Sequence, residues 1–221
     1  MSRADAPLAL DHVAHGPALG KGRAVVLLLH GLGHTPADAW ATLGPAVPGD
    51  VSVLALEGPW PMLDGAPGTG WFSVDFTPQG PRVDLAQERA SRAALLDLAT
   101  AIREGPAGAQ PLFVMGFSQG GIVGLHALLE RPALITGSIV ATGRLLDAVA
   151  DALPPAPHHE GLPVLWAHGT ADPIIPLAAA AVGQQRVKGY GVDLTTIAHQ
   201  GGHEVPPELP SAIRDWLEPR L

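Results

Sequence analysis

The sequence contains no cysteine, and this absence excludes disulfide bonds, thiolate metal sites and a cysteine nucleophile. Positive charge is also scarce, because 13 lysine and arginine residues stand against 21 acidic residues and the formal net charge is -8. The few basic residues form no run, so no surface is predicted to attract a polyanion. We therefore expect no nucleic-acid partner.

Long apolar runs are missing as well. No segment approaches the roughly 20 consecutive apolar residues that a membrane-spanning helix needs. The first residues of the chain lack the apolar stretch that characterises a secretory signal. From these absences we expect no membrane span and a cytoplasmic location.

The chain instead offers many short apolar segments, and its hydrophobic content of 47% supplies a sizeable core. Buried-type strand segments alternate with segments of helical period, which predicts an α/β fold with a mostly parallel central sheet and helices on both faces. The length of 221 residues suits a single domain, 1–221, with its core at about 24–217. Strands are expected at 24–29, 51–56, 112–116, 135–141, 162–168 and 192–198, with a short edge strand at 8–13. Helices are expected at 35–43, 83–103, 119–131, 145–153, 177–187 and 207–217.

The stretch 112–121 combines a strand, a sharp turn and the start of a helix. Within it, Gly116, Ser118 and Gly120 form the pattern G-x-S-x-G. This pattern is typical of the nucleophile elbow of α/β hydrolases, in which a strained turn lifts a serine hydroxyl above the sheet. A side chain at either glycine would collide with a neighbouring strand or helix. Ser118 is therefore the predicted nucleophile.

A serine hydroxyl needs a base to activate it, and the base needs a carboxylate to orient it. In α/β hydrolases both residues follow the serine along the chain, the acid first and the histidine second. Asp172 comes shortly after the strand expected at 162–168, at the carboxyl edge of the sheet, where a functional acid should lie. Asp147 and Asp151 fall on an expected surface helix, and Asp193 opens a strand at the opposite edge. Asp172 is the predicted acid, and a turn-forming role is the alternative.

Two histidines, His199 and His203, follow the last expected strand. His203 comes after two glycines and can reach back over Ser118, whereas His199 stays at the strand end, so His203 is the predicted base. Their H-x-x-x-H spacing resembles a zinc pair, but Gly201 and Gly202 argue against the helix that such a pair needs. We expect no metal site and no cofactor. Three further downstream histidines are expected on the surface or in packing: His126, His158 and His159.

A tetrahedral intermediate also needs two N–H donors for its oxyanion. One is expected from the residue after the nucleophile, Gln119, and the other from the loop after the first central strand, where Leu32 is the natural choice. Gly31 and Gly33 flank Leu32 and permit the required amide geometry.

The segment 57–81 reads as a long loop that is rich in glycine and proline but also carries large apolar side chains. Long loops in compact domains are often functional. These side chains either line an acyl pocket or pack the loop onto the core: Trp60, Met62, Leu63, Trp71, Phe72 and Phe76.

Five blocks of the sequence resemble the phospholipase/carboxylesterase family of α/β hydrolases, which includes bacterial carboxylesterases and the acyl-protein thioesterases. They occur in the family's order and comprise HGLG at 30–33, WF at 71–72, GFSQGG at 116–121, HGTADPIIP at 168–176 and GHE at 202–204. The resemblance implies a compact α/β-hydrolase fold without a large cap domain, and it implies Ser118, Asp172 and His203 as catalytic residues. It implies that Leu32 and Gln119 form the oxyanion hole.

The resemblance also implies contacts with the acyl chain at Trp71, Phe72, Ile174 and Ile175, and Leu63 is a further expected contact. We expect a serine carboxylesterase for short to medium acyl esters, acting on small molecules as a monomer or homodimer. An acyl thioesterase or lysophospholipase would use the same residues. A non-catalytic binding module that retains the fold is the alternative from another class.

Overall fold

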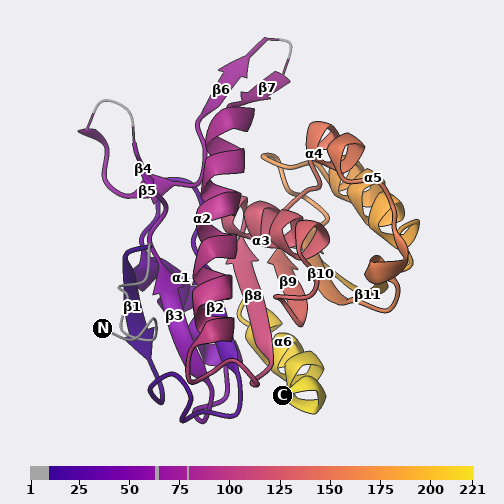
Figure 1. The fold of residues 1–221 in the computed structure, drawn as a ribbon. Helices are drawn as coiled ribbons and strands as arrows, with labels where there is room; N and C mark the ends of the chain where they lie inside the picture. The colour runs from indigo at the N-terminus through magenta and orange to yellow at the C-terminus, as the bar shows by residue number, and fades with distance from the viewer. Residues whose placement is uncertain (1–9, 63–64, 79) are drawn as a thin grey trace.

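The computed structural model describes residues 10–62, 65–78 and 80–221. A central sheet of seven strands runs through the molecule in the order β1-β3-β2-β8-β9-β10-β11 (Figure 1). Strand β1 pairs antiparallel with β3, and every other neighbouring pair in this sheet is parallel. The strands are β1 (His12–His15), β2 (Val25–Leu29), β3 (Ser52–Leu56), β8 (Leu112–Phe117), β9 (Gly137–Ala141), β10 (Pro163–Gly169) and β11 (Asp193–His199).

Helices cover both faces of this sheet (Figure 1). Side chains from α2, α3, α4 and α5 form one apolar cluster with the sheet, and side chains from α1 and α6 form a second cluster on the opposite face. The helices are α1 (Pro36–Leu43), α2 (Leu85–Glu104), α3 (Gln119–Glu130), α4 (Asp147–Ala152), α5 (Leu177–Lys188) and α6 (Leu209–Leu217), and short 3₁₀ turns occur at Gly44–Ala46, Pro157–His159 and Glu218–Arg220. The predicted α/β architecture is confirmed.

The central strands are mostly apolar because the sheet is covered on both sides, and the polar residues in them are small, as at Ser52 and Ser138. All five residues of β2, of β3 and of β9 are buried. A strand buried on both faces needs a continuous apolar run and not an alternating one. This is why residues 25–29 and 52–56 could be recognised from sequence.

The edge strand lies further along the chain than expected. Strand β1 begins at His12 and ends at His15, not at 8–13, and residues 1–9 are outside the described part of the chain. Its register pairs His12 with Leu56 and His15 with Val53. Three of its four residues are exposed, so it has no apolar run from which its position could be read.

The segment 57–81, which the sequence predicts to be a loop, contains two short antiparallel hairpins. Strand β4 (Trp60–Pro61) pairs with β5 (Thr69–Gly70), and β6 (Val74–Thr77) pairs with β7 (Gly80–Val83). The β6–β7 hairpin projects beyond the end of the sheet, above α2 (Figure 1). The prediction failed because these strands are only two to four residues long and three of the four contain proline or glycine, which read as turn residues.

Local capping explains where two of the helices begin. The Thr35 side chain accepts a hydrogen bond from the Asp38 N–H, and Asp38 accepts one from the Thr35 N–H, which is a capping box at the start of α1. Asp84 caps α2 by accepting from the N–H groups of Ala86 and Gln87. Among the described residues, no helix is both long and apolar enough to cross a membrane.

Candidate active site

Ser118 stands between β8 and α3 in a backbone conformation that non-glycine residues rarely adopt, with φ of 52° and ψ of -118°. Its N–H donates to the Ala141 carbonyl oxygen over 2.9 Å, which anchors the turn to β9. A Cβ atom at Gly116 would lie 2.2 Å from the Gly120 carbonyl carbon, and one at Gly120 would lie 2.4 Å from the Leu29 oxygen. The two glycines are therefore sterically required for the turn that presents Ser118.

The structure brings the three predicted catalytic side chains together. The His203 ring lies between the other two, with Nε2 2.9 Å from Ser118 Oγ and Nδ1 2.9 Å from Asp172 Oδ2. An ionised carboxylate only accepts, so Nδ1 carries the proton and Nε2 is free to accept from the serine hydroxyl. Ser118 and Asp172 are buried, and His203 is partly exposed. This geometry suits proton transfer from the serine to the histidine.

Asp172 is held in its charged form by hydrogen bonds. Burial favours the neutral carboxyl, but donors from His203 and from the N–H groups of Ile174 and Ile175 outweigh burial and hold the pKa of Asp172 below its ordinary value. The two backbone N–H groups reach Oδ1 over 2.8 and 2.9 Å, while His203 uses Oδ2. One oxygen of Asp172 therefore organises a turn, as the alternative interpretation has it, and the other faces the histidine, as the predicted acid should.

His168 is a neighbour of this group that sequence reasoning missed. Its Nε2 lies 2.8 Å from the Ile175 carbonyl oxygen, to which it donates, and 3.5 Å from Asp172 Oδ2. Burial lowers the pKa of His168, which favours the neutral ring. His168 thus fixes the turn that carries Asp172. Its place near the end of β10, four positions before Asp172, was the available signal.

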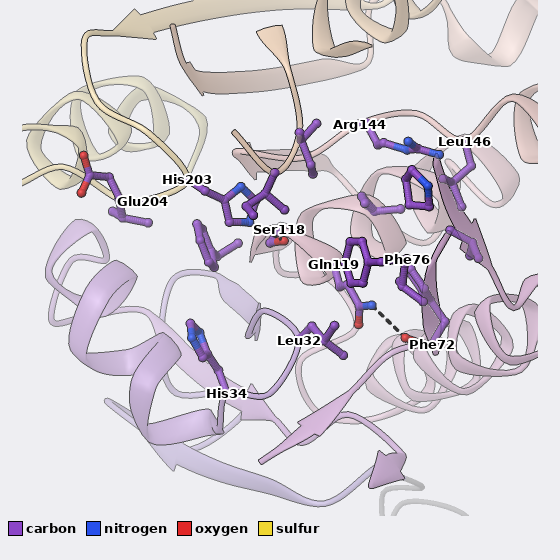
Figure 2. A pocket seen from close by; sticks show the side chains of 18 of the residues that line it. Leu32, His34, Phe72, Phe76, Ser118, Gln119, Arg144, Leu146, His203 and Glu204 are labelled. Atoms are coloured by element: carbon purple, nitrogen blue, oxygen red, sulfur yellow. Dashed lines mark hydrogen bonds between the residues drawn. The ribbon is translucent and has the colours of Figure 1, made fainter. Parts of the chain in front are cut away.

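Leu32 and Gln119, the expected oxyanion donors, both lie at the pocket that contains Ser118 (Figure 2). Gln119 is the first residue of α3, and the N–H groups of a first helical turn have no acceptor within the helix. Leu32 follows β2 in the neighbouring loop. Both residues therefore lie at the same pocket as Ser118, and their role as oxyanion donors stays a prediction.

The Gln119 side chain has a second role that the sequence did not reveal. Its Oε1 accepts from the Trp71 N–H over 2.9 Å, and its Nε2 donates to the Phe72 carbonyl oxygen over 2.8 Å (Figure 2). The side chain is buried, so these are the contacts that satisfy it. Gln119 therefore fastens the loop at Trp71 and Phe72 to the start of α3.

A cavity of about 510 Å³ opens beside Ser118 and His203. Three predicted acyl contacts, Phe72, Ile174 and Ile175, belong to its wall. The wall is mostly apolar and is completed by side chains from the β6–β7 hairpin, from the end of β8, from α3 and from the turns after β2 and β9: Leu32, Val74, Phe76, Pro81, Val83, Phe117, Ile122 and Leu146. Such a wall suits a hydrocarbon chain.

One expected acyl contact, Trp71, lies behind this wall, and another falls outside the described residues. The Trp71 side chain is fully buried and its indole donates to the His30 carbonyl oxygen over 2.9 Å, so it supports the loop from behind and does not line the cavity. Leu63 lies outside the described residues. Of the two interpretations of the loop aromatics, packing applies to Trp71 and pocket lining applies to Phe72 and Phe76.

A buried charged cluster supports the pocket from the α2 side. Glu88 Oε1 accepts from His126 Nδ1 over 2.9 Å and from Arg92 Nε over 3.0 Å. His126 Nε2 in turn accepts from the N–H of Leu146, a pocket residue, over 3.3 Å. Burial opposes the charge on Glu88, but hydrogen bonds from His126 and Arg92 outweigh it and hold the pKa of Glu88 low, while burial lowers the pKa of His126. The cluster is thus an ionised Glu88 beside a neutral His126.

A serine on a strained strand-to-helix turn, with a histidine and a buried aspartate at the carboxyl edge of a mostly parallel sheet, defines an α/β hydrolase. Residues 17–219 match the family model described as phospholipase/carboxylesterase. The chain belongs to that family and is a carboxylic ester hydrolase.

Named relatives agree with this assignment. The chain is 29% identical to a probable carboxylesterase of Oryza sativa subsp. japonica, with 93% of this chain and 92% of the relative covered. It is 28% identical to acyl-protein thioesterase 1 of Neurospora crassa, over 93% of this chain and 90% of the relative. The crystal structure of esterase PE8 superposes with a TM-score of 0.80 at 23% identity and covers 96% of this chain and 99% of that one, which supports the fold.

Proposed function

We propose that the protein is a serine carboxylesterase that hydrolyses short to medium acyl esters through an acyl-enzyme. The observation that carries the proposal is the position of the His203 ring, which lies within 2.9 Å of both Ser118 Oγ and Asp172 Oδ2. A hydroxyl with a neutral imidazole acceptor, itself oriented by a carboxylate, is the arrangement that activates serine for attack on a carbonyl.

In the proposed reaction, Ser118 Oγ attacks the ester carbonyl while His203 Nε2 takes the hydroxyl proton. The carbonyl oxygen becomes an oxyanion that accepts from the N–H groups of Leu32 and Gln119. Collapse of the intermediate breaks the bond to the alcohol, which leaves with the proton from His203. Water then attacks the acyl-enzyme with His203 again as base, and the acid is released.

The preference for short to medium chains is supported by the dimensions and chemistry of the pocket. A cavity of about 510 Å³ with an apolar wall accommodates a modest hydrocarbon chain next to the ester. Phe72, Ile174 and Ile175 supply apolar contacts in the same cavity as Ser118 and His203. Each buried methylene should add up to about 0.8 kcal/mol until the chain exceeds the pocket.

A panel of p-nitrophenyl esters graded by acyl length tests this function. We expect kcat/KM to rise from acetate to a maximum at short or medium length and then to fall. We expect Ser118→Ala to lose activity by at least about 10³-fold while retaining the fold. Hydrolysis by Ser118→Ala at the wild-type rate would contradict the proposed nucleophile.

An acyl thioesterase activity is a second candidate, favoured by the similarity to the Neurospora crassa acyl-protein thioesterase. The same three residues would carry it, as they would carry lysophospholipase activity, so the substrate decides between these activities. Matched acyl esters and acyl thioesters of equal chain length should be compared by kcat/KM. A consistent preference for the thioester beyond its intrinsic reactivity would replace the carboxylesterase assignment.

A binding module without catalysis would behave differently toward a mechanism-based probe. A fluorophosphonate reacts with an activated serine and leaves a covalent adduct of known mass. We expect one adduct on the peptide that contains Ser118, and none after Ser118→Ala. Folded wild-type protein that stays unlabelled would support the binding module.

A further inference from the structure

Arg144 is a cation in the wall of an otherwise mostly apolar pocket (Figure 2). It follows β9, shortly after Thr142, and its side chain is partly buried. Within the described part of the chain, no hydrogen bond, ion pair or ring contact involves its guanidinium. A guanidinium that has lost part of its hydration gains from an anionic partner, and this one has none.

The other arginines show how unusual this is. Every other buried or partly buried arginine among the described residues has acidic or carbonyl partners. These are Arg23 with Asp50 and Glu218, Arg92 with Glu88 and Glu130, Arg103 with the carbonyls of Leu134, Gly108 and Gln110, Arg186 with Asp147 and Asp151, and Arg220 with Asp193 and the Trp216 carbonyl. Arg144 is the exception, and it is the one that faces the pocket.

The acidic residues near Arg144 are already committed to other partners. Asp147, three positions along the chain, pairs with Arg186, and Glu88 pairs with Arg92 and His126. Glu204 also belongs to the pocket wall, but it lies on the opposite side of Ser118 (Figure 2) and its Oε1 accepts from the Gly202 N–H. Among the residues that the structure describes, none therefore offers Arg144 a counter-charge at this place, and a ligand could supply it.

The position of Arg144 indicates which part of an ester would meet it. The leaving alcohol must lie near His203, because that residue donates its proton, and the oxyanion must face the N–H groups of Leu32 and Gln119. The acyl chain then extends away from His203 and from the oxyanion donors, along the rest of the pocket. Figure 2 shows Arg144 and Leu146 on the side of Ser118 away from His34 and Glu204.

We propose that Arg144 selects esters whose acyl part carries a distal carboxylate, such as half-esters of dicarboxylic acids. The inference rests on the proposed function and names its substrate class. The methylenes of such an acyl group would pass along the apolar wall, and its carboxylate would accept hydrogen bonds from the Arg144 guanidinium. With a net charge of -8 the protein as a whole repels anions, so recognition depends on this local cation.

The test compares pairs of esters with equal acyl length, with and without the distal charge: p-nitrophenyl hydrogen adipate against the hexanoate, and hydrogen suberate against the octanoate. The measured quantity is the ratio of kcat/KM for the charged ester to that for the neutral ester. This ratio cancels any loss of activity common to both esters. The variants are Arg144→Met, which removes the charge, and Arg144→Lys, which keeps it. Arg131→Met is the matched control, because Arg131 is exposed at the far end of α3.

We expect Arg144→Met to lower the ratio by about 10- to 100-fold for at least one pair, the effect typical of losing a charge-assisted hydrogen bond. Arg144→Lys should recover part of the ratio, and Arg131→Met should leave it at the wild-type value. Salt screens both the attraction to Arg144 and the general repulsion by the protein, so in Arg144→Met, where only the repulsion is left, the ratio should rise with salt, and in the wild type it should rise less or fall. A ratio that is the same in wild type and Arg144→Met for both pairs would overturn the inference.

A third pair locates the anion. Hexanoyl glycerol 3-phosphate carries its charge in the alcohol part, and monohexanoyl glycerol is its neutral counterpart. A loss confined to this pair in Arg144→Met would contradict recognition on the acyl side. If Ser118 is required for hydrolysis of the neutral esters but substitution of Arg144 changes none of the ratios, the inference about Arg144 fails and the proposed function stands. If wild type hydrolyses no ester, the proposed function fails with it.

Discussion

Removing the Gln119 side chain should destabilise the protein, because two buried backbone groups depend on it. In Gln119→Ala the Trp71 N–H and the Phe72 carbonyl oxygen lose their partners, which lie at 2.9 and 2.8 Å in the structure. Trp71 and Phe72 are both buried, so water does not readily replace these partners. An unsatisfied buried donor or acceptor costs about 1–3 kcal/mol. The free energy of unfolding should therefore fall by about 2–5 kcal/mol.

Urea unfolding of wild type and Gln119→Ala, followed by circular dichroism, measures this difference. A protein of this size should also lose about 5–15 °C in Tm. Gln185→Ala is the matched control, because Gln185 is exposed on α5 and its side chain makes none of the hydrogen bonds found for Gln119. If the two variants unfold within about 0.5 kcal/mol of each other, Gln119 does not fasten the loop.

Three further outcomes are expected. Glu88→Ala leaves His126 and its neighbours without their central acceptor and should cost about 3 kcal/mol by urea unfolding. In the folded protein the pKa of Asp172 lies below its ordinary value of 3.8, so its charge stabilises the protein at neutral pH. This stabilisation is lost as the pH falls through the lowered pKa. Asp172→Asn should therefore have a lower Tm than wild type at neutral pH, and the difference in Tm should narrow in acid. Gly120→Ala places a Cβ 2.4 Å from the Leu29 oxygen and should cost at least about 4 kcal/mol or prevent folding, as judged by circular dichroism.

Each of these has a result that would contradict it. An average substitution costs about 1 kcal/mol. If Glu88→Ala lowers the free energy of unfolding by no more than that, the cluster contributes little to stability. A gap between Asp172→Asn and wild type that stays constant through acid pH would show that the charge of Asp172 is not the source. Gly49→Ala is the control for Gly120→Ala, because a Cβ at Gly49 meets no atom within 4 Å, and equal stability of the two would refute the steric reasoning.

The parts of the fold that could be predicted are those in which one physical requirement determines the sequence. Strands β2 and β3 are buried on both faces, so β2 is continuously apolar and β3 is apolar after Ser52, and both stand out from their surroundings. The turn at Ser118 tolerates no Cβ at Gly116 or Gly120, so it leaves a fixed pattern of glycines. Asp172 and His203 could be chosen because both follow strands at the same edge of the sheet.

Features that depend on contacts between distant residues could not be predicted. Gln119 meets Trp71 and Phe72 across 48 and 47 positions, and a glutamine in a helix gives no sign of such partners. His126 was expected on the surface or in packing, and its pairing with Glu88, 38 positions away, depends on how α2 and α3 pack. The β6–β7 hairpin was missed because both strands are only four residues long and β7 begins with Gly80 and Pro81, which read as loop residues.

The proposed acyl-enzyme on Ser118 can be observed directly. Protein mixed with p-nitrophenyl butyrate and quenched in acid within the first turnovers should carry one butyryl group, and peptide mapping by mass spectrometry should locate it on the peptide that contains Ser118. His203→Ala and Ser118→Ala should not accumulate the adduct. Full turnover by wild type with no acyl group at Ser118, or with the group at another residue, would contradict the proposed mechanism.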